Sequence, residues 1–120
     1  MPKVSKQNAL HVDDLGIAED HHEDLDGYTV NFVQIRQDHD LGPILKALPG
    51  GKCACPHWGL VLKGRLTIRY DDWEETVEAG EAFYMPPGHA PAAEAGTEFV
   101  QFSPADQLAA MTAAIMKAMS

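Results

Sequence analysis

The chain has 120 residues, of which 45% are hydrophobic and 22% are charged, a composition typical of one globular domain. Its 18 acidic and 9 basic residues give a formal net charge of -9, and a surface of this sign repels phosphate backbones, which disfavours nucleic acid as a partner. The sequence has neither the ~20 consecutive apolar residues of a membrane span nor an apolar signal segment, so we expect a cytoplasmic protein with reduced thiols and no membrane partner.

The N-terminal part of the chain predicts little regular structure. Residues 1–27 are polar and poorly periodic, and we expect an arm with one short strand or turn that ends at Gly27. Aromatic and β-branched residues fill residues 28–36, which predicts a strand that is either bulged or buried on both faces. A further short strand is expected at 44–48, between two turns.

The middle of the chain predicts a series of short strands. A β-hairpin is expected for residues 52–62 and 65–70, with Gly64 supplying the positive φ of the tight turn. Leu66 and Ile68 alternate with polar residues, which indicates one buried face. Three more strands are expected at 74–78, 82–86 and 97–103. Turn signals recur about every ten residues, which is the signature of an all-β sandwich or barrel.

The end of the chain changes to a helical period. Ser103 is a capping residue, Pro104 suits the first helical position, and Asp106 completes a capping box, so a helix is predicted over 104–120. One apolar stripe runs along this helix and is made of Leu108, Met111, Ile115 and Met119. We expect the stripe to pack on the rest of the chain or, if it is exposed, on a partner subunit.

The stretch CACPHW, residues 53–58, holds both cysteines of the chain close to a histidine. On a strand, Cys53, Cys55 and His57 would point to the same side, although Pro56 implies an edge, a bulge or a loop there. Thiolate and imidazole ligands suit zinc, and also iron, nickel or copper. The alternative is that the cysteines are small buried apolar residues and the histidine a hydrogen-bonded core residue.

A second segment could supply a fourth ligand. In FYMPPGHAP a Pro-Pro-Gly turn ends a strand and projects His89 near its tip. Together, CACPHWGLVLKGRLTIRY and VEAGEAFYMPPGHAP resemble the two signature motifs of the cupin superfamily, which are small jelly-roll barrels with a ligand or metal site inside. The resemblance rests on Gly64, Gly80, Pro86 and Gly88 and covers about half of the chain.

The ligand positions of the family are occupied by other residue types in this chain. The family's metal-binding histidines and glutamate fall on Gly51, Cys53, His57 and Pro91, and its asparagine falls on Ala95. Cys53, Cys55 and His57 nevertheless keep the parity of the family's ligand positions, and His89 lies two residues before that of the missing histidine. We therefore predict a divalent transition metal, zinc before iron or nickel, on these four residues. The alternative is that the metal was lost and a pocket was kept.

The sequence thus predicts a single cupin-type jelly-roll barrel at 28–103, with an N-terminal arm at 1–27 and a C-terminal helix at 104–120. The expected function is binding of a metal ion, a small organic molecule or both, either as a metal-dependent enzyme or as a non-catalytic binding, sensing or interaction domain. No catalytic residue is assigned. Four ligands would make the metal structural or sensory, whereas three would leave a position open for a substrate.

A homodimer through strand exchange or helix packing is also expected. Other side chains of interest are the carboxylates Glu74, Glu78 and Glu94 and the predicted barrel-lining residues Phe83, Met85, Trp58 and Tyr84.

Overall fold

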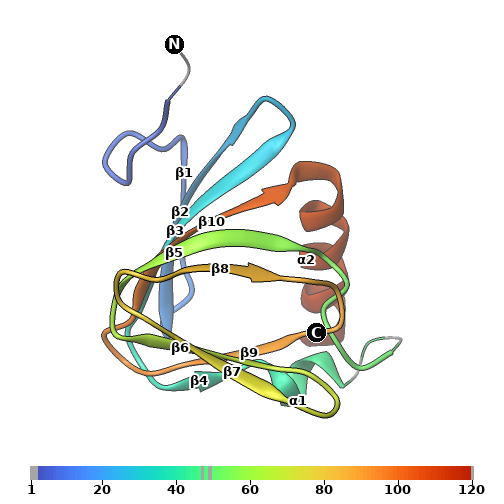
Figure 1. Cartoon of the computed structure of the whole chain (residues 1–120). Helices are drawn as coiled ribbons and strands as arrows, with labels where there is room; N and C mark the ends of the chain where they lie inside the picture. Colours follow the sequence, from blue (N-terminus) through green and yellow to red (C-terminus); the bar gives the residue numbers. More distant parts are fainter. Residues whose placement is uncertain (1–2, 47, 49, 120) are drawn as a thin grey trace.

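The computed structural model describes residues 3–46, 48 and 50–119, and Figure 1 shows the strands wrapped into a flattened barrel with a helix at one end. In chain order the elements are β1 (His11–Asp14), β2 (Ala18–Leu25), β3 (Tyr28–Ile35), β4 (His39–Asp40), α1 (Gly42–Leu45), β5 (His57–Lys63), β6 (Arg65–Arg69), β7 (Glu74–Glu78), β8 (Ala82–Met85), β9 (Ala90–Ala93), β10 (Glu98–Pro104) and α2 (Ala105–Met119). The predicted all-β jelly-roll architecture with a C-terminal helix is confirmed.

The strands form two antiparallel sheets that face one another. One has the order β1-β2-β3-β10-β5-β8, and the other has the order β4-β9-β6-β7. Between them lies a core that includes Val61 from the first sheet and Leu66 and Ile68 from the second, all at most 2% exposed. The alternation predicted for β6 is therefore confirmed, because its two arginines, Arg65 and Arg69, are exposed on the opposite face.

The predicted hairpin across Gly64 is wrong, although the glycine does have a positive φ of 72°. β5 pairs with β10 and β8, whereas β6 pairs with β7 and β9, so the chain passes from one sheet to the other at this corner. A Cβ atom on Gly64 would lie 2.7 Å from the Thr97 hydroxyl oxygen. Thr97 is fully buried, and its hydroxyl donates to the carbonyl of Arg65. The glycine is therefore needed for close packing at the corner as well as for its φ.

Two other segments differ from the expectation. The strand predicted at 44–48 is wrong at its start, because residues 44 and 45 belong to the short helix α1. Pro43 lies in the first turn of this helix, and Leu45 is completely buried. Ala47 of the predicted strand lies outside the described residues. Residues 1–27 contain two strands, β1 and β2, and β2 pairs with β3 along its whole length. The sequence does not predict β2 because a half-buried strand is recognised by alternating apolar and polar residues, and β2 has almost no apolar residues.

The apolar stripe of α2 packs on the chain's own barrel. Leu108, Met111 and Ile115 lie against a buried cluster that is made of Leu45, Cys53, Cys55 and Ala90. Among the described residues, no helix is long and apolar enough to cross a membrane. The helix therefore covers the end of the barrel at which both cysteines lie (Figure 1).

Candidate metal centre

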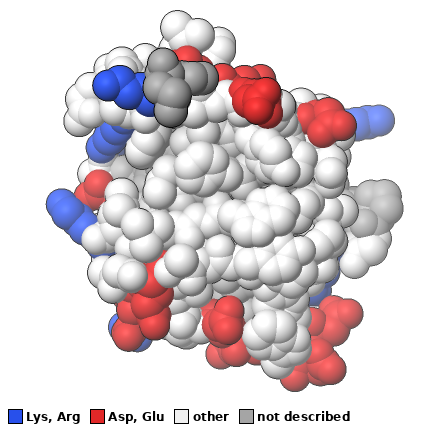
Figure 2. Space-filling view, turned by 45° about the horizontal axis from the view of Figure 1, so that its top comes forward, with Lys and Arg blue, Asp and Glu red and all other residues white. Residues whose placement is uncertain are grey.

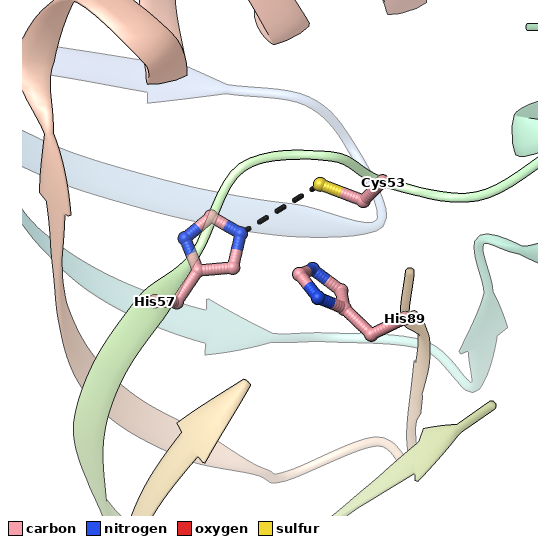
Figure 3. Close-up of side chains that lie close together, drawn as sticks. All are labelled: Cys53, His57 and His89. Atoms are coloured by element: carbon pink, nitrogen blue, oxygen red, sulfur yellow. Dashed lines mark hydrogen bonds between the residues drawn. The ribbon is translucent and has the colours of Figure 1, made fainter. Parts of the chain in front are cut away.

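Cys53, His57 and His89 converge at the end of the barrel beside α2 (Figure 3). One possible ligand atom from each lies within 4.8 Å of the other two, and the residues are 6%, 7% and 0% exposed. His57 is the first residue of β5, while an isolated bridge joins Cys53 to His89. In that bridge the amide of Cys53 donates to the carbonyl of His89 at 2.9 Å, and the amide of Gly88 donates to the carbonyl of Cys53 at 2.8 Å. The backbone thus fixes the two segments side by side.

His89 presents a free nitrogen to the cluster. Its Nδ1 lies 2.7 Å from the carbonyl oxygen of Pro86, and since a carbonyl only accepts, Nδ1 carries the hydrogen. Its Nε2 therefore has a lone pair, and this buried atom has no hydrogen-bond partner in the described structure. A buried acceptor without a partner costs about 1–3 kcal/mol, which a bound cation would offset.

The ring of His57 is oriented by Ser103 on β10. The hydroxyl oxygen of Ser103, which is completely buried, lies 2.6 Å from Nδ1 of His57, and Nε2 of the same ring lies 3.8 Å from Sγ of Cys53. Burial, with a smaller effect of His89, lowers the pKa of His57 to about 3, and burial also lowers the pKa of His89. Both imidazoles are therefore neutral at neutral pH, as metal ligands must be.

The two cysteines differ in position. Burial raises the pKa of the Cys53 thiol, which faces His57, so that thiol is protonated unless a cation is bound beside it. The Cys55 thiol instead lies 3.5 Å from the carbonyl oxygen of Pro56, and its pKa is raised to about 11, chiefly by burial. The structure thus brings three of the four predicted ligands together and places Cys55 outside the group.

The separation of Cys55 follows from Pro56. Regular pairing of β5 begins only at His57, after the proline, so the two-residue alternation assumed for 53–57 does not hold. Cys53 reaches the group through its bridge to His89 rather than through strand parity.

A cavity of about 180 Å³ adjoins the three residues. Its polar lining comes from Cys53, His57, His89, Gln101 and Thr112, and the remaining lining residues are Leu41, Leu45, Leu66, Met85, Pro91, Phe99, Leu108, Met111 and Ile115. No carboxylate lines it in the described part of the chain. The cavity therefore suits a small, largely apolar molecule with a metal-coordinating atom.

The other side chains named from the sequence have mixed positions. Met85 lines the cavity, whereas Phe83 is buried in the core between the sheets. Trp58 and Tyr84, expected near the mouth of the barrel, lie exposed on the outside of the sheet and stack on one another. The carboxylates are also exposed and lie away from the cavity; these are Glu74, Glu78 and Glu94.

Sequence reasoning missed Ser103 and Gln101 as parts of the site. The sequence predicts Ser103 as the cap of the helix, but its hydroxyl bonds to His57 instead. The signal was present in the strand before the helix, because Phe99, Gln101 and Ser103 share one parity and Phe99 is an obvious core residue.

Comparison with known proteins finds similarity in structure alone. No family model and no curated protein matches the sequence. A protein of unknown function from Rhizobium leguminosarum is 22% identical with a TM-score of 0.63, over 86% of this chain and 95% of that one. The polyketide cyclase RemF from Streptomyces resistomycificus is 15% identical with a TM-score of 0.60, over 87% and 79%. An RmlC-like cupin from Shewanella frigidimarina is 14% identical with a TM-score of 0.58, over 84% and 88%. This chain therefore has the cupin fold, as the resemblance of its two motifs predicted.

Proposed function

We propose that this protein binds one transition-metal ion through Sγ of Cys53, Nε2 of His57 and Nε2 of His89, and that the ion helps to bind a small organic molecule in the adjoining cavity. The observation that carries the proposal is the buried Nε2 of His89, which has no partner and lies in a group with a thiol and a second imidazole. A structural core histidine would have its second nitrogen satisfied.

The donor set favours zinc over the hard cations. One thiolate and two neutral imidazoles are typical ligands of zinc, and iron or nickel remain the alternatives on the same donors. Three protein ligands are one fewer than the usual four of a structural zinc site, which leaves a position for an atom of the bound molecule. A bound ion would act there as a Lewis acid toward an oxygen or nitrogen atom of that molecule.

The lining of the cavity favours binding or sensing over hydrolytic catalysis. A general acid or base must lie within hydrogen-bond reach of the reacting atoms, and the described lining offers no carboxylate for that role. His57 and His89 have their second nitrogens committed to Ser103 and Pro86, so neither is free to shuttle a proton once it is a ligand. Gln101 and Thr112 are suited to orienting a polar group of the ligand.

The proposal includes a cytoplasmic location and a homodimer. A reducing compartment keeps the Cys53 thiol available as a ligand. The helix stripe first considered for the dimer is used on the chain's own barrel. We therefore assign the dimer contact to the outer face of the six-stranded sheet, whose exposed apolar side chains are Tyr28, Trp58, Leu60, Leu62, Tyr84 and Phe102.

Substitution of cobalt(II) for the native ion tests the metal centre directly. Cobalt bound to a thiolate gives a charge-transfer absorption that is absent when the ligands are nitrogen and oxygen alone. We expect the wild-type protein to bind about one ion per chain with this absorption, as the three-ligand site predicts. Cys53→Ser should abolish the charge-transfer absorption, and His89→Gln should greatly weaken binding.

Cys55→Ser is the matched control, because it alters the neighbouring thiol without touching the group. It should keep both the stoichiometry and the absorption of the wild type. Folded wild-type protein that binds no cobalt or zinc would contradict the proposal, as would a charge-transfer absorption that depends on Cys55 and not on Cys53.

A further inference from the structure

A second, larger cavity lies between the inner face of the first three strands and helix α2. We call it the acidic groove; its volume is about 670 Å³, within the usual range of small-molecule sites. Its sheet wall is made of Leu10, His11, Asp13, Asp20, His22, Glu23, Asp24, Thr29, Asn31 and Gln101, and its helix wall of Ala105, Leu108, Ala109, Thr112, Ala113 and Met116. In Figure 1 most of the sheet wall belongs to β1 and to the upper hairpin of β2 and β3, with Gln101 from β10, and the other wall is the neighbouring helix α2.

The sheet wall carries more acidic than basic side chains, and its only described basic ones are His11 and His22. Four carboxylates line the groove, while none of its lining residues in the described chain is a lysine or an arginine. Asp13 contacts His22 at 2.9 Å, and Asp24 accepts the Thr29 hydroxyl at 2.7 Å. Glu23 accepts a backbone amide at 3.2 Å. These contacts are local and leave the groove electronegative.

Asp20 and Asn31 form a hydrogen-bonded pair on this wall. Both carboxylate oxygens of Asp20 accept from Nδ2 of Asn31 at 3.1 Å, and burial raises the pKa of Asp20. Asn31 is 5% exposed, and its Oδ1 is buried with no hydrogen-bond partner in the described structure. A carboxylate and an amide oxygen thus lie together, and both can accept further hydrogen bonds. A ligand group with several N–H donors would match them.

The helix wall determines what kind of cation fits. It is almost entirely apolar, because Thr112 is the only polar residue among its described lining residues. A hydrated metal ion would find no ligands on that side, and the described residues place no three carboxylate, histidine or cysteine atoms of this groove within metal-binding distance of one another. An apolar molecular body would instead bury surface against the helix.

We propose that the acidic groove binds an organic cation, a primary ammonium or guanidinium group attached to an apolar body. The cationic group donates hydrogen bonds to the carboxylate of Asp20 and to Oδ1 of Asn31, while the apolar body lies along α2. Its proposed cation contacts, Asp20 and Asn31, are separate from the Cys53, His57 and His89 group, although Gln101, Leu108 and Thr112 line both cavities.

Calorimetric titration with hexylamine, which is cationic at neutral pH, tests the proposal against two probes with the same apolar body. Hexanol is uncharged and hexanoate is anionic. We expect saturable binding of one hexylammonium per chain and no measurable binding of the other two. Asp20→Asn keeps the shape of the side chain and should weaken hexylammonium about 10- to 100-fold, the value of a hydrogen bond to a charged group. The charge-matched control Asp72→Asn, in an exposed turn, should leave the affinity unchanged.

A second variant decides the matter if Asp20→Asn does not fold. Ala109 lines the groove and its side chain is exposed, so the bulky side chain of Ala109→Trp should fill the groove. This variant alters no carboxylate and should abolish binding. Ala110→Trp, on a face of the helix that does not line the groove, should bind as the wild type does. The proposal is overturned if hexylammonium does not bind, if hexanol binds as tightly, or if Ala109→Trp keeps the wild-type affinity.

Discussion

The inner and outer faces of the six-stranded sheet carry different kinds of side chain on the same strands. On β10, Ser103 points inward to hold His57, while its neighbour Phe102 is exposed on the outside. On β5, His57 belongs to the metal group, while Trp58 is 41% exposed and stacks on Tyr84. One residue along a strand therefore separates the site from the outer surface, so register decides which residues can take part in the chemistry.

Figure 2 brings the top of the barrel in Figure 1 forward and shows a centre without charged side chains, ringed by acidic and basic groups. On a chain with a net charge of -9, such a face is where two copies can approach without bringing acidic segments together. We therefore propose ligand binding for the inner face and self-association for the outer face.

The largest expected effect is a loss of stability at low pH, which arises from His57 on the inner face. It is measured on protein from which any metal has been removed with a chelator. Folded His57 has a pKa of about 3, while an unfolded histidine titrates near 6.5, so only the unfolded chain takes up this proton between these values. The contribution of His57 to the free energy of unfolding is therefore complete above pH 6.5 and decreases as the pH falls toward 3. Between pH 7 and pH 4 the free energy of unfolding should fall by roughly 3 kcal/mol because of this group. Urea unfolding at both pH values should show a smaller loss in His57→Gln than in the wild type.

His22→Gln, which removes a histidine of the acidic groove, controls for the loss of an imidazole. If the wild type and His57→Gln lose stability equally between the two pH values, His57 is not the buried neutral group described above.

A smaller effect is expected from Ser103, whose hydroxyl contacts His57 of the proposed metal centre. Ser103→Ala removes the hydroxyl 2.6 Å from Nδ1 and should lower zinc affinity about 10- to 100-fold, as the loss of an orienting partner does in other metal sites. Competition with a chromophoric chelator measures this change. Thr76→Ala, which removes an exposed hydroxyl on β7, should have the affinity of the wild type, and an equal affinity in Ser103→Ala would show that the hydroxyl does not position the ligand.

The smallest change in stability is expected on the outer face. Trp58→Arg loses its contacts with Tyr84 and Tyr28 and should lower the free energy of unfolding by about 1 kcal/mol or less. It should nevertheless convert a dimer to a monomer in sedimentation velocity, because it places a charge in the proposed contact. Trp73→Arg changes the other exposed tryptophan, away from this sheet, and should remain dimeric. A wild-type protein that sediments as a monomer at high concentration contradicts the assignment.

Sequence reasoning succeeded where one residue type imposes a local conformation. The glycines and proline of the two motifs predicted the fold, and the alternation of Leu66 and Ile68 predicted the buried face of β6. The proximity of Cys53, His57 and His89 was predictable because both cysteines lie close to His57 in the sequence and the second cupin-like motif contains His89.

Most of the failures come from interactions between segments distant in sequence, and one comes from a local interruption of a strand by a proline. The partners of β5 and β6 are set by sheet pairing, which a glycine turn alone does not determine. Parity alone groups Cys55 with Cys53 and His57, but Pro56 precedes the start of β5 and breaks this alternation. The acidic groove was missed because β2 has the polar composition of a solvated loop, and it becomes a wall only when α2 packs beside it.

The wall shared by the two cavities has a thermodynamic consequence. Gln101, Leu108 and Thr112 contact both spaces, so an occupant that shifts these side chains on one side changes the shape of the other. By reciprocity, the factor by which the first occupant alters the affinity of the second is the factor by which the second alters that of the first. Binding at the proposed metal centre and binding in the acidic groove would then be linked, with α2 as the element between the two cavities.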